Sequence, residues 1–171
     1  MARLVFPARL ILGPLATLAL CGCGREQEVM LADQEQFGAT WQLGESSGAA
    51  VVASFPVTKR LAYFLSVSST VRPSSRNVAA RVVLRAGPGE LVRPLTEQLT
   101  LATNRSVLSD LLYLARGAAC TDSTARVDPG LRQAVEMTAR REGAAQLANE
   151  VREALAAFEV RDCAVFLVPL R

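Results

Sequence analysis

The stretch Leu61-Ala62-Tyr63-Phe64-Leu65-Ser66-Val67-Ser68 decides the expected fold. Positions 61, 63, 65 and 67 carry large apolar residues, and the positions between them carry Ala, Phe, Ser and Ser. Successive side chains of a strand point to opposite faces, so an apolar residue at every second position is typical of a half-buried strand. We therefore predict a strand at residues 61–68.

The segments on both sides of this stretch favour further strands. Ala49–Val57 is a continuous apolar run that ends next to Pro56, and Val78–Arg85 is rich in β-branched residues. The second run is closed by Gly87-Pro88-Gly89, which is typical of a turn. A weaker alternation at residues 95–101 predicts one more strand.

Beyond residue 103 the apolar period becomes helical. A group of apolar residues falls on one face at about 100° per residue: Val107, Leu108, Leu111, Leu112 and Ala115. Thr103 or Asn104 is the expected N-cap of this helix, and Gly117 its expected end. Asp128-Pro129 predicts the start of another helix. We expect a break at Gly143, because the apolar residues before and after it would lie on opposite sides of one straight helix.

The chain closes with the apolar run Ala164–Val168, for which we predict a short buried strand. The expected fold class is therefore α+β, with antiparallel strands in the N-terminal half and three helices and a short final strand in the C-terminal half.

The N-terminal residues predict a targeting signal. Arg3 and Arg9 accompany the apolar run Leu10–Leu20, and this run of about 11 residues is too short to span a bilayer. A basic start, a short apolar core and small residues are typical of a secretory signal peptide. The next residues, Leu20-Cys21-Gly22-Cys23, resemble the lipobox of bacterial lipoproteins.

This resemblance implies lipidation of Cys23, with acyl chains such as palmitate on its sulfur and amino group. Cys21 is the competing site, but the bulky Leu20 precedes it where a small residue is preferred. Several acyl chains anchor a protein firmly, and Gly24 in the next position favours the outer membrane, facing the periplasm. The alternative is an ordinary secretory signal cut near Gly22 or Gly24, which leaves a free thiol.

We accordingly expect a signal peptide at residues 1–22, a lipidated N-terminus and polar tether at 23–44, and a single periplasmic domain at 45–171. Two cysteines then remain, Cys120 and Cys163. An even number of remaining cysteines in an oxidising compartment predicts a disulfide between them. The alternative is two buried free thiols.

The sequence lacks the usual combinations of catalytic residues. The chain has no histidine, which excludes His-based nucleophile systems and His-ligated metal sites. Gly44–Gly48 matches the G-x-S-x-G pattern of α/β-hydrolases but lacks its histidine base, and Lys59 stands at no S-x-x-K spacing. We read Glu150 and Glu153 as a solvated helix face and Arg140-Arg141 as a basic spot near a helix end. We therefore assign no catalytic, cofactor-binding or metal-binding residue, and a net charge of +3 argues against a nucleic-acid partner.

The C-terminal part, about Ser106 to Leu167, is similar in pattern to the pilotin lipoproteins of type II secretion. The similarity rests on Cys120, Asp128-Pro129, Arg141-Glu142-Gly143 and Cys163. Those proteins are all helical, so the strands expected over Ala49–Leu101 depart from them.

From these features we expect a non-enzymatic accessory or assembly protein, attached to the membrane by a lipid anchor, that binds or positions another envelope protein. Two alternatives stay open: a lipid or small-molecule carrier with an apolar pocket, and a periplasmic hydrolase that uses carboxylates alone.

Overall fold

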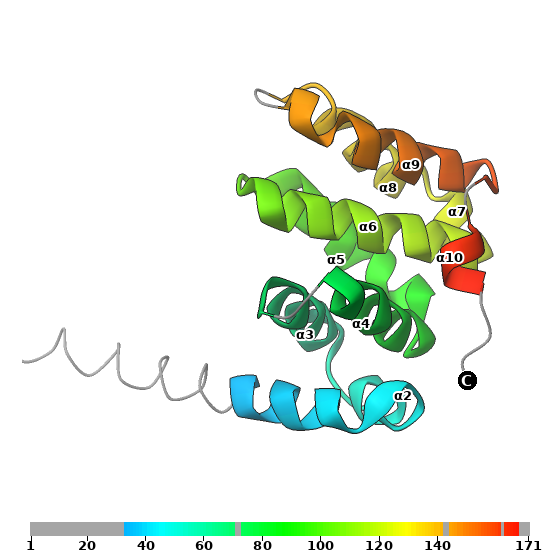
Figure 1. Ribbon diagram of the computed structural model, residues 1–171. Helices are drawn as coiled ribbons and strands as arrows, with labels where there is room; N and C mark the ends of the chain where they lie inside the picture. The colour runs from blue at the N-terminus through cyan, green and yellow to red at the C-terminus, as the bar shows by residue number, and fades with distance from the viewer. Residues whose placement is uncertain (1–32, 71–72, 142–143, 162, 168–171) are drawn as a thin grey trace, which may run out of the picture. The chain divides into compact units, whose positions relative to one another are not determined.

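The computed structural model describes residues 33–70, 73–141, 144–161 and 163–167 (Figure 1). The chain divides into two units, Met1–Glu35 and Gln36–Arg171, and of the first only residues 33–35 are described, as helix. After a helical stretch at residues 36–42, the elements of the second unit are α2 (Gly44–Ala53), α3 (Val57–Thr70), α4 (Pro73–Arg85), α5 (Pro88–Leu101), α6 (Arg105–Thr121), α7 (Ser123–Val127), α8 (Pro129–Thr138), the 3₁₀ turn η1 (Ala144–Leu147), α9 (Ala148–Phe158) and α10 (Ala164–Leu167).

Within the second unit the helices form stacked hairpins (Figure 1). Three pairs, α3 with α4, α5 with α6 and α8 with α9, pack against each other as neighbours along the chain. Between layers, α2 packs on α4, α4 on α6 and α6 on α9, while α3 packs on α5 and α5 on α8. Helix pairs are stacked in this manner in α-solenoids, where each layer contacts mainly its neighbours.

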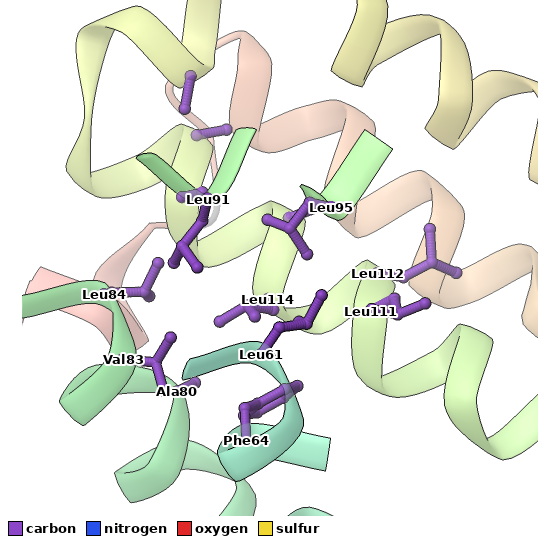
Figure 2. Packing of buried hydrophobic residues seen from close by; sticks show 14 of the residues in the cluster. Leu61, Phe64, Ala80, Val83, Leu84, Leu91, Leu95, Leu111, Leu112 and Leu114 are labelled. Carbon is purple, nitrogen blue, oxygen red and sulfur yellow. The ribbon is translucent and has the colours of Figure 1, made fainter. Parts of the chain in front are cut away.

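The core runs through the layers as a continuous apolar cluster (Figure 2). It is built from the facing sides of α3, α4, α5 and α6, and includes Leu61, Phe64, Val83, Leu84, Leu91, Leu95, Leu111, Leu112 and Leu114. On α5 the fully buried residues are Leu91, Leu95 and Leu99, four residues apart. That spacing places them on one face of a helix.

The predicted α+β fold is wrong, because helices account for 86% of the described residues and no strand occurs among them. Residues 61–68 lie within α3. Tyr63 and Phe64 are adjacent and both fully buried, which a strand with one buried face does not allow. The buried positions 60, 61, 63, 64 and 67 instead follow the i, i+3, i+4, i+7 rule of a helix.

The other predicted strands are also helical. Ala49–Val57 contributes to α2 and the start of α3, Val78–Arg85 lies in α4, and residues 95–101 lie in α5. On α5 a strand would place residues 99 and 101 on one face, yet Leu99 is buried and Leu101 is 71% exposed. Of the final predicted strand, residues 164–167 form α10.

The predicted helix starts are confirmed. The Asn104 side chain accepts hydrogen bonds from the backbone N–H groups of Ser106 and Val107 at the start of α6. The Asp128 side chain accepts one from the N–H of Leu131, with Pro129 as the first residue of α8. The predicted end of α6 at Gly117 is wrong, since the helix continues to Thr121.

The predicted break between the last two long helices agrees with the described residues on either side, since α8 ends at Thr138 and α9 begins at Ala148. Gly143 itself lies outside the described residues. Each helix buries its own set of residues, Leu131, Ala134, Val135 and Thr138 on α8 and Val151, Ala154, Ala157 and Phe158 on α9.

Candidate functional site

One side of the stack, formed by α2, α4, α6 and α9, carries a ladder of ion pairs. Each pair joins an arginine of one layer to a carboxylate of the next, with 2.8, 3.0 and 2.5 Å between nitrogen and oxygen: Arg81–Glu45, Arg76–Asp110 and Arg116–Glu153. Their arginine side chains are between 13% and 26% exposed. The ladder thus joins neighbouring layers, although desolvation of partly buried charges offsets much of their attraction.

Asp110 is the most buried carboxylate of this ladder, with 9% of the residue exposed. Arg76 Nε lies 3.0 Å from one of its oxygens, and the Ser68 hydroxyl donates to the other at 2.6 Å. Both carboxylate oxygens of Asp110 are thus engaged by side chains of neighbouring helices. This arrangement holds α3, α4 and α6 together.

Tyr113 of α6 lies in the middle of the ladder. The Arg76 guanidinium carbon lies 4.4 Å from the centre of its ring, within the range of a cation–π contact. Burial raises the pKa of Tyr113, and the charges of Arg76, Arg116 and Arg81 oppose that shift only in part. Its hydroxyl is therefore protonated at neutral pH.

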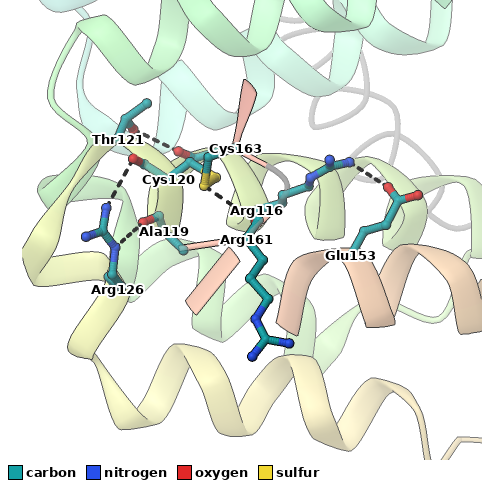
Figure 3. The surroundings of a disulfide bond; sticks show 9 residues. Arg116, Ala119, Cys120, Thr121, Arg126, Glu153, Arg161 and Cys163 are labelled. Atoms are coloured by element: carbon teal, nitrogen blue, oxygen red, sulfur yellow. Dashed lines mark hydrogen bonds and ion pairs between the residues drawn. A yellow bond between two sulfur atoms is a disulfide. The ribbon is translucent and has the colours of Figure 1, made fainter. Parts of the chain in front are cut away.

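The C-terminal segment is fastened across α6 by two contacts. The predicted disulfide is confirmed: Cys120 and Cys163 are joined, with their Cα atoms 5.4 Å apart (Figure 3). The Phe166 ring lies 5.1 Å from the Tyr113 ring and 5.8 Å from the Arg116 guanidinium carbon. We call residues 163–167, with these two attachments, the C-terminal clasp.

Backbone carbonyl groups at the end of α6, beneath the clasp, accept hydrogen bonds from nearby side chains. The Arg126 guanidinium donates from Nε to the carbonyl of Ala119 and from Nη2 to that of Cys120, at 2.9 and 3.2 Å (Figure 3). The Thr121 hydroxyl donates to the carbonyl of Gly117 at 2.8 Å. Cys120 therefore stands on a rigid helix end, which gives the clasp a fixed position.

The clasp nevertheless exposes apolar side chains. Val165 and Leu167 are 40% and 60% exposed, while Phe166 between them is 6% exposed. A four-residue helix held by a disulfide and one buried ring thus presents two aliphatic side chains to solvent. Val165 and Leu167 thus form a small apolar surface whose position is fixed by the disulfide.

A pocket of about 310 Å³ lies where the end of α8 meets η1 and α9. Its lining is apolar apart from one cation and consists of Ala139, Ala145, Ala148, Val151, Arg152 and Leu155. The volume is at the lower end of the range of about 300–1,000 Å³ that is typical of small-molecule sites.

The residues of the G-x-S-x-G pattern lie at the start of α2. Ser46 and Ser47 are exposed in the first turn of α2, and Glu45 pairs with Arg81. The Lys59 ammonium lies 5.3 Å from the centre of the Phe55 ring. Cys23, the predicted lipidation site, lies outside the described residues.

Two charged features make contacts with other helices that the sequence does not predict. Glu150 and Glu153 do not form a solvated face: Glu153 pairs with Arg116, and Glu150 accepts a hydrogen bond of 3.4 Å from Ser109. Arg140 and Arg141 follow the end of α8, as predicted, and the Arg141 side chain also donates to the carbonyls of Ala102 and Thr100 at the C-terminus of α5, both at 2.8 Å.

Sequence reasoning missed the ion-pair ladder. Its partners are 34 to 37 residues apart in sequence, as with Arg116 and Glu153, so no local motif signals them. In the part of the chain that the structure describes, no helix has the length and hydropathy to cross a bilayer, and no group of His, Cys, Asp and Glu is placed to hold a metal ion. No protein family, curated protein or solved structure matches this chain.

Proposed function

We propose that the protein is a lipid-anchored periplasmic accessory or assembly protein, which binds or positions another envelope protein and catalyses no reaction itself. The observation that carries this proposal is the C-terminal clasp, in which Val165 and Leu167 are exposed on a segment fixed by the Cys120–Cys163 disulfide. A surface that is ordered before its partner arrives loses less conformational entropy on binding.

The N-terminal sequence supports the anchoring part of the proposal. Leu20-Cys21-Gly22-Cys23 follows a short apolar run, and residues 25–28 after it are polar. Any tether between the anchor and the domain lies before residue 36, because the second unit begins at Gln36 and Phe37 is buried in its core. Tethering serves a protein that must act at a given place, and it brings little to an enzyme with a soluble substrate.

The ion-pair ladder favours a binding role over a carboxylate-based hydrolase. General acid–base work needs a carboxylate that faces the substrate and is free to exchange a proton. Asp110, by contrast, is engaged by Arg76 and Ser68, and Glu153 by Arg116. The ladder thus uses its charged groups to join layers.

The similarity to pilotin lipoproteins agrees with this proposal. The strands expected over Ala49–Leu101 were its main departure, and that region is helical. The similarity rests on a loose pattern of cysteines and helix starts, so it supports a class of role and not a particular partner.

The test is capture of partners from gently solubilised envelopes by full-length protein. Leu167→Asp and Val165→Asp change exposed side chains and should leave the fold intact, but each should abolish capture of the specific partner. Leu101→Asp is the matched control, because Leu101 is also exposed and apolar but lies at the end of α5. Cys23→Ala should yield a folded, released protein without function. Full function from that variant, or capture that is indifferent to residues 165 and 167, would contradict the proposal.

A further inference from the structure

The helix of the C-terminal clasp is too short to be stable by itself. Helix α10 has four residues, and isolated helices of fewer than about 12 residues are marginal in water. Within the clasp Cys163 and Phe166 are buried, whereas Ala164, Val165 and Leu167 are exposed. Ordering each residue costs conformational entropy, and the burial of two side chains offsets only part of that cost. The closed position of the clasp, packed on α6, therefore depends on the disulfide.

The base of the clasp contains a strained residue. Val160, just beyond α9, has a φ of +61°, in the left-handed region that β-branched residues avoid. Glycine usually takes this position at the end of a helix. The Val160 side chain is 59% exposed, so its own packing compensates little for the strain. Strain of this kind persists only where the surrounding structure fixes the backbone, and the Cys120–Cys163 disulfide fixes it from a few residues further along the chain.

The disulfide is buried when the clasp is closed (Figure 3). Cys120 is 4% exposed and Cys163 is 6% exposed. Thiol–disulfide exchange requires a thiolate to reach a sulfur atom, so free thiols have poor access to this bond. When the clasp is detached, Cys163 lies on a free segment where an oxidant reaches it. The bond is therefore formed from the open state and protected in the closed state.

We propose that formation of the Cys120–Cys163 disulfide is the switch that assembles the binding surface of the clasp. In the reduced protein residues 163–167 are detached from α6, and Val165 and Leu167 form no fixed surface. The protein therefore binds its partner only after export, because thiols stay reduced in the cytosol and are oxidised in the periplasm. The switch works in one direction, since closure buries the bond. This inference rests on the proposed function, because it specifies the regulation of the same surface.

The redox step uses an oxidant that is itself a disulfide, of the thiol-oxidase class. One thiolate of the protein attacks a sulfur atom of this oxidant, which forms a mixed disulfide and releases one thiolate of the oxidant. The second protein thiolate then displaces the oxidant from the mixed disulfide. The protein loses two electrons and its two thiol protons, and the oxidant gains both electrons and ends as a dithiol. The S–S bond between Cys120 and Cys163 thus replaces that of the oxidant.

The test compares two ring contacts by nuclear Overhauser effects in the full-length protein. The rings of Tyr113 and Phe166, whose centres are 5.1 Å apart, give the clasp signal, which reports the closed state. The rings of Phe37 and Tyr63, whose centres are 5.5 Å apart, give the core signal, which reports the fold away from the clasp. The oxidised parent protein should show both signals.

The variant that keeps the clasp open is Cys120→Ala with Cys163→Ala. This alanine pair should lower the clasp signal at least about tenfold, because the closed state loses its covalent attachment, and it should leave the core signal unchanged. In the same background Val160→Gly should raise the remaining clasp signal about fivefold, since glycine adopts a positive φ without strain. Arg161→Gly is the matched control and should give no increase, because Arg161 is also exposed but its φ is not positive.

Capture from gently solubilised envelopes connects the switch to binding. The oxidised parent protein should retain its specific partner, and the alanine pair at most about a tenth as much, because its binding-competent state is rarely populated. A persistent clasp signal in the alanine pair, loss of the core signal, no gain from Val160→Gly, or equal capture by both proteins would overturn the inference. The proposed function would still stand if Leu167→Asp abolished capture. Absence of capture by the oxidised parent protein, or capture indifferent to residue 167, would count against both.

Discussion

Gly117 lies so close to Phe166 that a Cβ built on the glycine would come within 2.8 Å of Cε1 of the phenylalanine ring. The same Cβ would lie 2.5 Å from Cδ1 of Leu84 on α4. Only a glycine leaves room for both neighbours, which explains a glycine inside α6 despite a cost of about 1 kcal/mol relative to alanine in a helix. The contact between α4, α6 and the clasp therefore depends on the lack of a side chain at Gly117.

Gly117→Ala should displace the clasp. The buried ring of Phe166 must move, and overpacking of this kind costs about 1–3 kcal/mol, offset in part by the better helix propensity of alanine. We expect a lower urea midpoint and faster amide hydrogen exchange at residues 163–167. Gly38→Ala is the control, since no atom lies within 4 Å of its added Cβ, and it should be neutral or slightly stabilising. Equal midpoints for Gly117→Ala and the parent protein would contradict the account.

The disulfide should contribute a large part of the stability. It joins residues 43 apart in sequence, and the chain-entropy model gives about 4 kcal/mol for a loop of that length. Urea unfolding of the oxidised protein should therefore occur at clearly higher concentration than that of the reduced protein or of Cys163→Ser. Mass analysis without reductant should find neither Cys120 nor Cys163 alkylated. Two reactive thiols in freshly isolated native protein would refute the pairing.

The helix starts explain how much of the fold could be predicted. Proline is the first residue of α4, α5 and α8, and Pro56 immediately precedes α3. The pattern predicts the helix start correctly at Pro129, where an aspartate precedes it, but Gly87-Pro88-Gly89 is typical of a turn, although Pro88 begins α5. The alternation at residues 61–68 favours a strand over the helix starts that the prolines indicate. A buried helix between two layers is apolar on more than one face, so a short segment of it can show the same alternation as a strand.

The candidate site could be predicted only where its parts are covalent or local. The even number of cysteines that remain after the predicted lipidation, together with the expected oxidising compartment, was sufficient to predict the Cys120–Cys163 pair. The position of Phe166 over Gly117, and the pairing of Arg76 with Asp110, arise from the stacking of layers and have no sequence signature. The expected α+β fold does not place α9 against α6. The contacts of Glu150 and Glu153 with α6 therefore could not be predicted.

Arg60 should be the arginine whose loss costs most. It is 8% exposed and donates to the carbonyls of Phe55, Ala53 and Ala86 and to the Glu90 carboxylate, at 2.6–2.9 Å. It thereby satisfies the backbone where the α2–α3 and α4–α5 connections begin. Arg60→Met leaves these carbonyls without a donor, and at about 1–3 kcal/mol for each unsatisfied buried group we expect a total loss of at least about 2 kcal/mol in urea unfolding.

Arg93→Met is the matched control for Arg60→Met. Arg93 pairs with Glu97 one turn further along α5, at 2.9 Å, and its side chain is 89% exposed. Exposed pairs at this spacing contribute about 0.3–0.5 kcal/mol. Comparable losses for the two variants would mean that the carbonyl contacts of Arg60 do not stabilise the fold.

Tyr63→Phe should leave the protein as stable as the parent or more stable. Tyr63 is fully buried, its ring stands edge-on to that of Phe37 at 5.5 Å, and its hydroxyl has no hydrogen-bond partner in the described part of the chain. An unsatisfied buried hydroxyl costs about 1–3 kcal/mol, and phenylalanine removes it while keeping the ring. A clear loss of stability in urea unfolding would show that the hydroxyl is satisfied after all.

The same residue should make the fold sensitive to alkali. Burial raises the pKa of Tyr63 from 10.0 to about 12. The folded state then keeps the phenolic proton at pH values where the unfolded state releases it, so the contribution of Tyr63 is complete below pH 10 and declines as the pH rises towards 12. The loss reaches about 1.4 kcal/mol at pH 11, because one pKa unit corresponds to 1.36 kcal/mol.

Urea unfolding at pH 8 and pH 11 measures this loss, and Tyr63→Phe should reduce it by about that amount. Parallel pH profiles for the parent protein and Tyr63→Phe would rule out Tyr63 as the group responsible.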